Sequence, residues 1–226
     1  MSESTRQVSR ASSASEFYDA IAEEYEALFL DASSLDENQT VFDLIGKDIW
    51  QGDGILDLGC GPGTLLGYVD VPPPKYLGLD ISPKMVALAQ RRHPAHHFKA
   101  ADITDADVLA ETALRLDFTG YGFAVSTFGV LSYVEDLSAV LSNVARLLHR
   151  DGKLFFMVYK AGYSPYTHER FGQSVPHKTY TMQEIRDILE PDWKRGMVLD
   201  LGDFVGGVGL ELDASRRDGW HSWLGL

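Results

Sequence analysis

Short apolar runs alternate with helix-like segments over the middle of the chain. Five runs have the length and apolar content of buried strands, at residues 55–58, 76–79, 97–101, 122–126 and 153–159. Between them lie segments with apolar positions at helical spacing, notably residues 82–93, 105–116 and 136–150. This alternation predicts a parallel sheet that is covered by helices on both faces and joined by right-handed crossovers.

The two ends of the chain depart from this alternation. Residues 1–14 are polar and serine-rich, and we expect a disordered arm there. Residues 15–52 predict two helices, one from Ser15 and one from about Thr40, which would form a lid at the edge of the sheet. Residues 53–160 then form the core of the domain.

Residues 161–226 predict a loop, a helix and a hairpin. No regular period occurs over 161–180, and so long an irregular segment is typical of a functional loop. Thr181 and Glu184 have the spacing of a capping box, and Pro191 would end that helix. Residues 197–201 and 204–212 predict an antiparallel pair of strands, which brings the sheet to seven. The apolar tail from Trp220 to Leu226 has no clear role.

Composition narrows the class of function. Twenty basic and thirty-three acidic residues give a net charge of −13, which disfavours nucleic acid as a partner. No apolar run reaches the roughly 18–20 residues that span a membrane, and we expect neither a secretory leader nor a membrane partner. A single cysteine fits a reducing compartment. These features predict a cytoplasmic protein that acts on a small molecule, with its oligomeric state left open.

The segment after the first predicted strand contains one acid and alternating glycines: Asp57, Gly59, Gly61 and Gly63. Glycines at a strand-to-helix turn allow positive φ and let a ligand lie against the backbone, although a tight turn without ligand has the same pattern. A dinucleotide fingerprint would need glycine where Thr64 or Leu66 stands. Because Asp57 would repel a pyrophosphate and attract an ammonium group, we expect a cationic nucleoside without phosphate.

Two further acids follow the next two predicted strands. Asp80 lies 21 residues after Gly59, close to the spacing of a carboxylate that holds a ribose diol. The alternative is a helix cap, for which Ser82 is better placed. Asp102 would accept a hydrogen bond from an adenine amine or simply lie in a turn. The carboxyl ends of parallel strands share one edge of a sheet, where ligands bind, so we expect the three acids to meet there.

The stretches DLGCGPGT from Asp57 and GLDISPKMVALA from Gly78 resemble the class I S-adenosylmethionine-dependent methyltransferases of the small-molecule type. The likeness covers about residues 15–160 and is most specific over 55–103. It implies a Rossmann-like, doubly wound α/β fold in a single domain over 15–226. It also implies S-adenosyl-L-methionine as cofactor and S-adenosyl-L-homocysteine as product.

By the same resemblance, the glycine turn would hold the methionine part and the ribose of the cofactor. Two aromatic residues would close the lid, the strand-end acids and their neighbours would hold the nucleoside, and the end of the fourth strand would contact the sulfonium. The implied cofactor residues are Tyr18, Tyr25, Asp57, Gly59, Cys60, Gly61, Gly63, Asp80, Ile81, Met85, Asp102, Ile103, Ser126 and Thr127.

The methyl acceptor is less well defined. A sulfonium methyl is already a strong electrophile, so a general base is needed only for an acceptor that is protonated at neutral pH. His168 and His177 in the long loop are candidates for that base, although loop histidines are more often exposed. Four aromatic residues would line an acceptor pocket or simply pack in the core: Tyr133, Tyr163, Tyr166 and Phe171.

We predict no metal site. His93, His96 and His97 straddle a proline without a neighbouring acid or cysteine, which indicates a turn. The acceptor atom stays open among oxygen, nitrogen and carbon. Two other functions remain: a module that binds the cofactor without transferring its methyl group, and an NAD-dependent dehydrogenase, which the glycine spacing disfavours.

Overall fold

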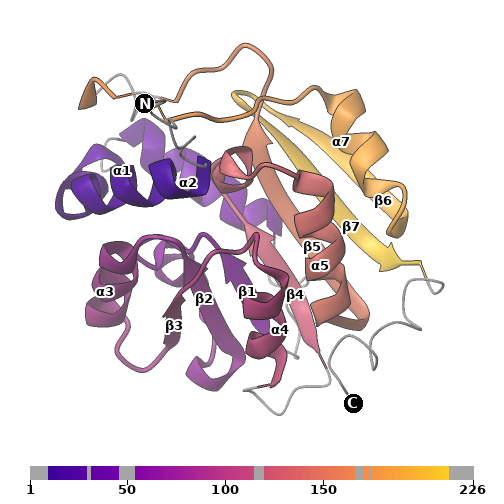
Figure 1. Cartoon of the computed structure of the whole chain (residues 1–226), viewed down its shortest axis with the longest axis horizontal. Helices are drawn as coiled ribbons and strands as arrows, with labels where there is room; N and C mark the ends of the chain where they lie inside the picture. Colours follow the sequence, from indigo (N-terminus) through magenta and orange to yellow (C-terminus); the bar gives the residue numbers. More distant parts are fainter. Residues whose placement is uncertain are drawn as a thin grey trace, which may run out of the picture.

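A seven-stranded sheet forms the centre of the molecule (Figure 1). The computed structural model describes residues 10–29, 32–45, 54–114, 120–165, 171–173 and 175–213. The strand order is β3-β2-β1-β4-β5-β7-β6. The strands are β1 Ile55–Leu58, β2 Tyr76–Asp80, β3 His97–Ala100, β4 Tyr121–Ser126, β5 Leu148–Tyr159, β6 Trp193–Leu201 and β7 Phe204–Leu212. The first five pair in parallel, whereas β7 is antiparallel to both β5 and β6, which confirms the predicted α/β fold.

Helices surround this sheet, and two of them lie across its upper edge in Figure 1. The α-helices are α1 Arg10–Tyr25, α2 Ala32–Ile45, α3 Pro83–Arg92, α4 Ala106–Leu114, α5 Leu137–Leu147 and α7 Met182–Leu189. Short 3-10 helices are η1 Glu26–Phe29, η2 Thr64–Gly67, η3 Pro73–Lys75 and η4 Val130–Tyr133. None of the helices that the structure describes is both long and apolar enough to cross a bilayer.

Alternating residues of each central strand enter two separate hydrophobic clusters. Leu56 and Leu58 of β1 pack in one cluster with α4, α5 and α7, whereas Ile55 packs in the other with α1 and α2. On β5 the pair Phe155 and Phe156 divides in the same way. This period of two is the expected consequence of a sheet that is covered on both faces.

Two predicted helix starts are confirmed by their caps. Ser82 caps α3 by accepting a hydrogen bond from the backbone N–H of Met85, with Pro83 at the first helical position. Thr181 and Glu184 form the reciprocal capping box that opens α7.

Several predicted boundaries were wrong. Residues 10–14, expected in a disordered arm, belong to α1, and Ala14 is buried. Helix α2 begins at Ala32 rather than near Thr40. The sequence did not reveal this start, because the first turns of the helix are polar and carry no apolar period. Helix α5 ends at Leu147, before the expected turn at 151–152, because the backbone from Leu148 already pairs with β4.

Strand β6 likewise starts before the predicted Met197. Its first residue, Trp193, is buried and pairs with the end of β7, a contact that a local pattern does not reveal. The tail from Trp220 to Leu226 lies outside the described residues.

Candidate functional site

Three acidic residues lie at or near the carboxyl ends of three adjacent strands. Asp57 is the third residue of β1, Asp80 is the last residue of β2, and Asp102 follows β3 by two residues. The parallel register pairs Asp57 with Gly78 and brings these strand ends to one edge of the sheet. All three acids line a single cleft, with α1 along one side of it.

The turn after β1 brings the protein backbone to the surface of this cleft. Gly59, Gly61 and Gly63 have positive φ angles of 72°, 53° and 82°. The N–H groups of Gly59 and Cys60 donate to the carbonyl oxygen of Leu79, at 2.7 and 2.9 Å, and thereby hold the turn against β2. A Cβ built on Gly61 would meet no atom within 4 Å, so open space lies directly above this residue. The turn is therefore shaped to let a ligand contact the main chain.

Asp80 is held by two backbone donors. Its Oδ2 accepts from the N–H of Gly61 at 2.8 Å, and its Oδ1 accepts from the N–H of Ser82 at 2.9 Å. Burial raises the pKa of this carboxyl to about 6, although the two N–H donors act in the opposite direction. Each carboxylate oxygen has a second lone pair, so both oxygens retain capacity to accept from a pair of hydroxyl groups.

Asp57 places a second buried carboxyl beside the first. Its Oδ2 accepts a hydrogen bond of 2.7 Å from the Tyr76 hydroxyl. Burial raises the pKa of Asp57 to about 7, the Tyr76 hydrogen bond lowers it, and the charge of Asp80 raises it further. Two buried carboxyls that line the same cleft favour a ligand that brings positive charge into it.

The cleft is partly open to solvent. Most of the residues that the sequence assigned to a cofactor line it: Tyr18, Tyr25, Asp57, Gly59, Cys60, Gly61, Asp80, Ile81, Met85, Asp102, Ile103 and Thr127. Burial raises the pKa of the Cys60 thiol, which keeps it protonated and suits it to packing.

Two of the assigned residues are not among those that line the cleft. Gly63 caps η2 and its Cα faces the ring of His93. Ser126 is fully buried and donates its hydroxyl to the carbonyl oxygen of Leu58 at 2.8 Å, which ties β4 to β1. Asp102 lines the cleft and also accepts from the backbone and hydroxyl of Thr104, so the turn role considered for it is present as well.

Several lining residues were missed by the sequence analysis. They come from the lid helix, the glycine turn, the end of β3 and η4: Ala14, Pro62, Thr64, Leu65, Ala101, Thr104, Phe128, Val130 and Val134. Phe128 has a φ of +54°, a backbone strain typical of functional sites, but nothing in the local sequence signals this angle.

A second cavity adjoins the first, and its walls contain both aromatic and polar side chains. The two share Tyr18, Tyr25, Pro62, Thr64 and Phe128. The second cavity is further lined by Ser34, Leu35, Glu37, Asn38, Gly67, Tyr68, Arg92, Tyr159, Tyr163, Pro165, Asp203 and Phe204. Most of these residues come from α2, from the end of β5 and the loop after it, and from the turn into β7, which the fold brings together from distant parts of the chain.

A line of tyrosine hydroxyls joins the two cavities. The Tyr18 hydroxyl donates to that of Tyr133 at 3.1 Å, and the hydroxyls of Tyr133 and Tyr159 lie 3.2 Å apart. Tyr133 lines the first cavity, Tyr159 the second, and Tyr18 both. Burial raises the pKa of all three phenols, so they remain protonated and can donate hydrogen bonds at neutral pH.

The remaining residues that the sequence suggested for the acceptor side lie in different places. Tyr163 lines the second cavity, whereas Phe171 packs edge-on against Phe17 with ring centroids 6.2 Å apart. His177 lies behind the cavities, with its Nδ1 3.0 Å from the carbonyl oxygen of Val175 and its ring against Tyr133 and Tyr159. Tyr166 and His168 lie outside the described residues.

The described residues contain no group of three histidine, cysteine or acidic side chains arranged to hold a metal ion. His96 instead has its Nε2 2.8 Å from the carbonyl oxygen of Val71, and His93 packs edge-on against it.

Comparison with known proteins identifies the family. Residues 56–154, which run from β1 into β5, match the family model described as a methyltransferase domain. Over these residues the chain is similar to a methyltransferase domain. The glycine turn after β1 and the acid at the end of β2 lie within this matched region.

Two curated relatives are methyltransferases whose names give different substrates. The chain is 31% identical over 115 residues to malonyl-[acyl-carrier protein] O-methyltransferase from Pseudescherichia vulneris, which covers 51% of this chain and 42% of that protein. It is 30% identical over 170 residues to demethylmenaquinone methyltransferase from Symbiobacterium thermophilum, covering 73% and 65% respectively. The chain thus spans less than two thirds of the length of either relative.

A solved structure shows that the likeness extends to the fold of nearly the whole chain. Magnesium protoporphyrin IX methyltransferase (ChlM) from Synechocystis PCC 6803 with bound SAH aligns with a TM-score of 0.60. The alignment covers 91% of this chain and all of that one, at 17% sequence identity.

Proposed function

We propose that this protein transfers the methyl group of S-adenosyl-L-methionine to a small molecule without a metal ion. The observation that supports this most strongly is the pair of adjoining cavities, which share walls formed by Tyr18, Tyr25 and Phe128. The first has the backbone turn and buried carboxyls that suit a cationic nucleoside, and the second has aromatic walls that suit an acceptor. Its relatives, methyltransferases of small or carrier-bound molecules by name, agree with this proposal.

The residues present fit the cofactor. Asp80 would accept from the ribose hydroxyls, while Asp57 would attract the ammonium group of the methionine part. Ile81 and Met85 would flank the adenine, and Asp102 would lie at its edge. The open space above Gly61 would be filled by the ligand, which would then lie directly on the turn.

When bound, the cofactor would supply an electrophilic methyl group on a positively charged sulfur: a lone pair of the acceptor would form the new bond to the methyl carbon, and the electron pair of the broken carbon–sulfur bond would stay on sulfur, giving S-adenosyl-L-homocysteine. The protein aligns the acceptor atom behind that carbon and excludes water from the region where the two cavities meet. Tyr18 donates its proton to Tyr133, and where Tyr133 donates to Tyr159, the Tyr159 hydroxyl would keep its own proton to hold the acceptor in the second cavity. All three phenols stay protonated. They are not general bases, because a base must begin without the proton it takes up.

The location and partners are part of the same proposal. The single cysteine, Cys60, is buried and reduced, as expected for a cytoplasmic enzyme of small-molecule metabolism. The excess of acidic residues supports a small molecule rather than nucleic acid as the partner.

The decisive experiment uses cofactor labelled in its methyl group. The protein is incubated with this cofactor and a metabolite extract, and the small-molecule fraction is analysed for label by mass spectrometry. We expect label in at least one metabolite with the wild-type protein, and much less with Asp80→Asn. Binding of S-adenosyl-L-homocysteine without any transfer of label would favour the cofactor-binding module instead. Thermal stabilisation by NADH but not by S-adenosyl-L-homocysteine would favour the dehydrogenase.

A further inference from the structure

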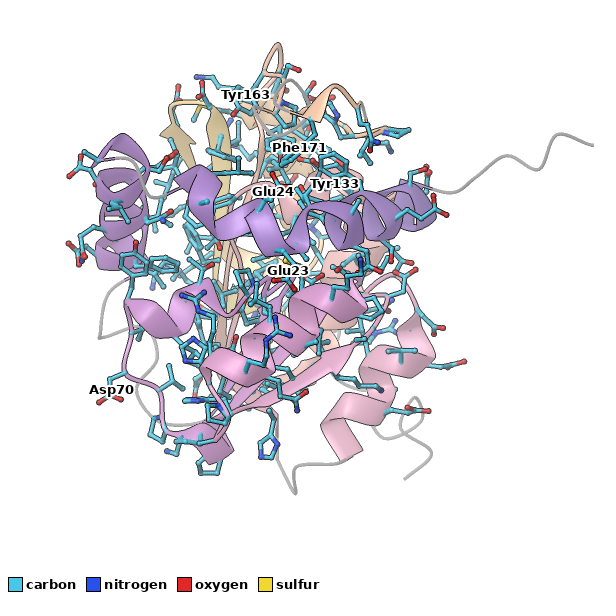
Figure 2. The ribbon with its side chains drawn as sticks, turned by 90° about the vertical axis from the view of Figure 1, so that its left-hand side faces the viewer. Glu23, Glu24, Asp70, Tyr133, Tyr163 and Phe171 are labelled. Atoms are coloured by element: carbon cyan, nitrogen blue, oxygen red, sulfur yellow. The ribbon has the colours of Figure 1, made fainter. Side chains whose placement is uncertain are left out.

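Helix α1 is fastened to the cofactor cleft by polar side chains as well as by its apolar face. Ser15 donates its hydroxyl to the carbonyl oxygen of Ile81 at 3.1 Å. Asp19, one turn further along, accepts at Oδ1 from the hydroxyl of Ser82 and from the backbone N–H of Lys84. Figure 2 shows α1 crossing the molecule directly above α3, whose first turn contains Lys84.

These contacts continue inward to the buried carboxylate. The hydroxyl of Ser82 donates to Asp19, while its backbone N–H donates to Oδ1 of Asp80 at 2.9 Å. Oδ2 of Asp80 then accepts from Gly61 in the turn after β1. Asp19, Ser82, Asp80 and Gly61 therefore form one hydrogen-bonded path from the surface of α1 to the glycine turn.

The same helix supplies the wall between the two cavities. Tyr18 adjoins Asp19 in sequence, lines both cavities, and donates its hydroxyl to Tyr133. On the inner face of α1, Phe17 and Ile21 are buried in the hydrophobic cluster that α1 shares with α2. A change in the position of α1 would therefore move the Tyr18 wall of the acceptor cavity.

We infer that Asp19 is a positioning residue, which couples occupancy of the cofactor site at Asp80 to closure of α1 over the acceptor cavity. The inference rests on the proposed function, because it takes Asp80 as the residue that binds the ribose. A ribose on Asp80 fixes Ser82, Ser82 fixes Asp19, and Asp19 holds α1 in place. The cofactor would therefore dissociate more slowly while this path is intact, and bound cofactor would in turn hold the Tyr18 wall of the acceptor cavity in place.

A second contact between α1 and α3 provides a matched control. Glu23 pairs with Arg91 at 3.5 Å, with both side chains largely exposed. Glu23 therefore shares with Asp19 its helix, its carboxylate and its partner helix, but not the path to the cofactor cleft. If any loss of a polar contact between α1 and α3 weakens binding, without a path through Ser82, then both variants should weaken it.

The test measures the affinity and dissociation rate of S-adenosyl-L-homocysteine, by calorimetry and stopped-flow fluorescence, in variants of the full chain. We expect Asp19→Ala to weaken binding about tenfold, mainly through faster dissociation, because it removes an acceptor shared by two donors. Asp19→Asn keeps an oxygen at that position and should stay within about threefold of wild type. Glu23→Ala should stay within about twofold, as an exposed ion pair contributes little.

A double-mutant cycle tests the path itself. If Asp19 acts through Ser82, then Asp19→Ala combined with Ser82→Ala should weaken binding by clearly less than the product of the two single effects. Equal affinities of Asp19→Ala and Glu23→Ala would overturn the inference and leave the proposed function intact, and so would two effects that multiply independently. A wild-type protein that does not bind S-adenosyl-L-homocysteine would overturn both.

Discussion

Gly61 donates its backbone N–H to Oδ2 of Asp80 across 2.8 Å, so the carboxylate at the end of β2 braces the turn that follows β1. The same carboxyl accepts from Ser82 through its other oxygen. Asp80 therefore has two tasks: it shapes the glycine turn, and it presents negative charge to the cleft. A substitution at this position therefore alters the support of the glycine turn and the charge of the cleft to different degrees, depending on the residue introduced.

We predict that Asp80→Asn weakens cofactor binding at least tenfold. The amide that replaces the carboxylate has one oxygen and one NH₂ group, so it can accept from only one of Gly61 and Ser82 and faces the other with a donor. The change also removes the negative charge from the cleft. Calorimetry with S-adenosyl-L-homocysteine measures the loss.

The control for this prediction is a check that the Asp80→Asn protein is still folded. Far-ultraviolet circular dichroism should be unchanged, and the free energy of unfolding should fall by no more than about 1–2 kcal/mol, since one hydrogen bond is lost. Unchanged cofactor affinity in a folded Asp80→Asn protein would show that the ribose is bound elsewhere.

The affinity for the cofactor should rise with pH between about 5.5 and 8. Burial raises the pKa of Asp80 to about 6 and that of Asp57 to about 7, so both carboxyls are increasingly neutral below these values in the free protein. A cationic ligand prefers the ionised forms, and its binding should release protons near pH 6. Calorimetry in two buffers with different ionisation enthalpies measures that release directly.

Asp57→Asn provides the comparison for this pH dependence. The variant removes the titrating group with the higher pKa, so fewer protons should be released on binding and the rise in affinity above pH 6.5 should flatten. A variant that keeps the wild-type pH profile would assign the titration to other groups.

The buried carboxyl of Asp57 should also make the ligand-free protein less stable at high pH. A carboxyl whose pKa rises on folding binds more protons folded than unfolded, so its contribution favours the folded state at low pH. That contribution is lost as the pH rises through the window from about 4, the unfolded value, to about 7, the folded value. We predict that Asp57→Asn raises the free energy of unfolding by on the order of 2 kcal/mol at pH 8.

Urea unfolding of the two proteins at pH 8 and at pH 4.5 checks this sign. At pH 4.5 the difference should largely disappear, because the native carboxyl is then protonated and keeps its hydrogen bond from Tyr76. A variant that is less stable than wild type at pH 8 would contradict the prediction.

The features predicted well from the sequence are those that local chemistry determines. The alternation of apolar runs located the strands, and Ser82 with Pro83 located the start of α3. The acids at the strand ends could be placed at one edge because parallel strands must end on the same side. Their meeting in a single cleft follows from that geometry.

The parts that failed depend on contacts between distant segments. The aromatic cavity is formed where β7 lies beside β5, so Tyr159 and Phe204 come together only through the antiparallel hairpin. The buried position of Ser126 depends on a hydrogen bond to Leu58, 68 residues away. Likewise, α1 begins before Ser15, because Ala14 is buried by tertiary packing rather than by any local signal.

The two glycines of the turn should respond differently to the same added methyl group. A Cβ on Gly59 would lie 2.2 Å from Cγ1 and 2.8 Å from Cβ of Val130, whereas a Cβ on Gly61 would meet no protein atom within 4 Å. Both residues have positive φ, so each alanine carries a similar backbone strain of about 1 kcal/mol. We therefore predict that Gly59→Ala lowers the free energy of unfolding by about 2–4 kcal/mol, and Gly61→Ala by only about 1 kcal/mol.

Ligand binding should reverse this order. In the folded protein the methyl group of Gly61→Ala projects into the space that the cofactor would occupy, so binding of S-adenosyl-L-homocysteine should weaken at least tenfold. Adding Val130→Ala to Gly59→Ala removes the clashing methyl groups and should restore part of the lost stability, while the same change added to Gly61→Ala should restore nothing. Denaturant unfolding and calorimetry on the four proteins separate the two effects. If Gly61→Ala bound the ligand as tightly as wild type, the cofactor would not lie on this turn.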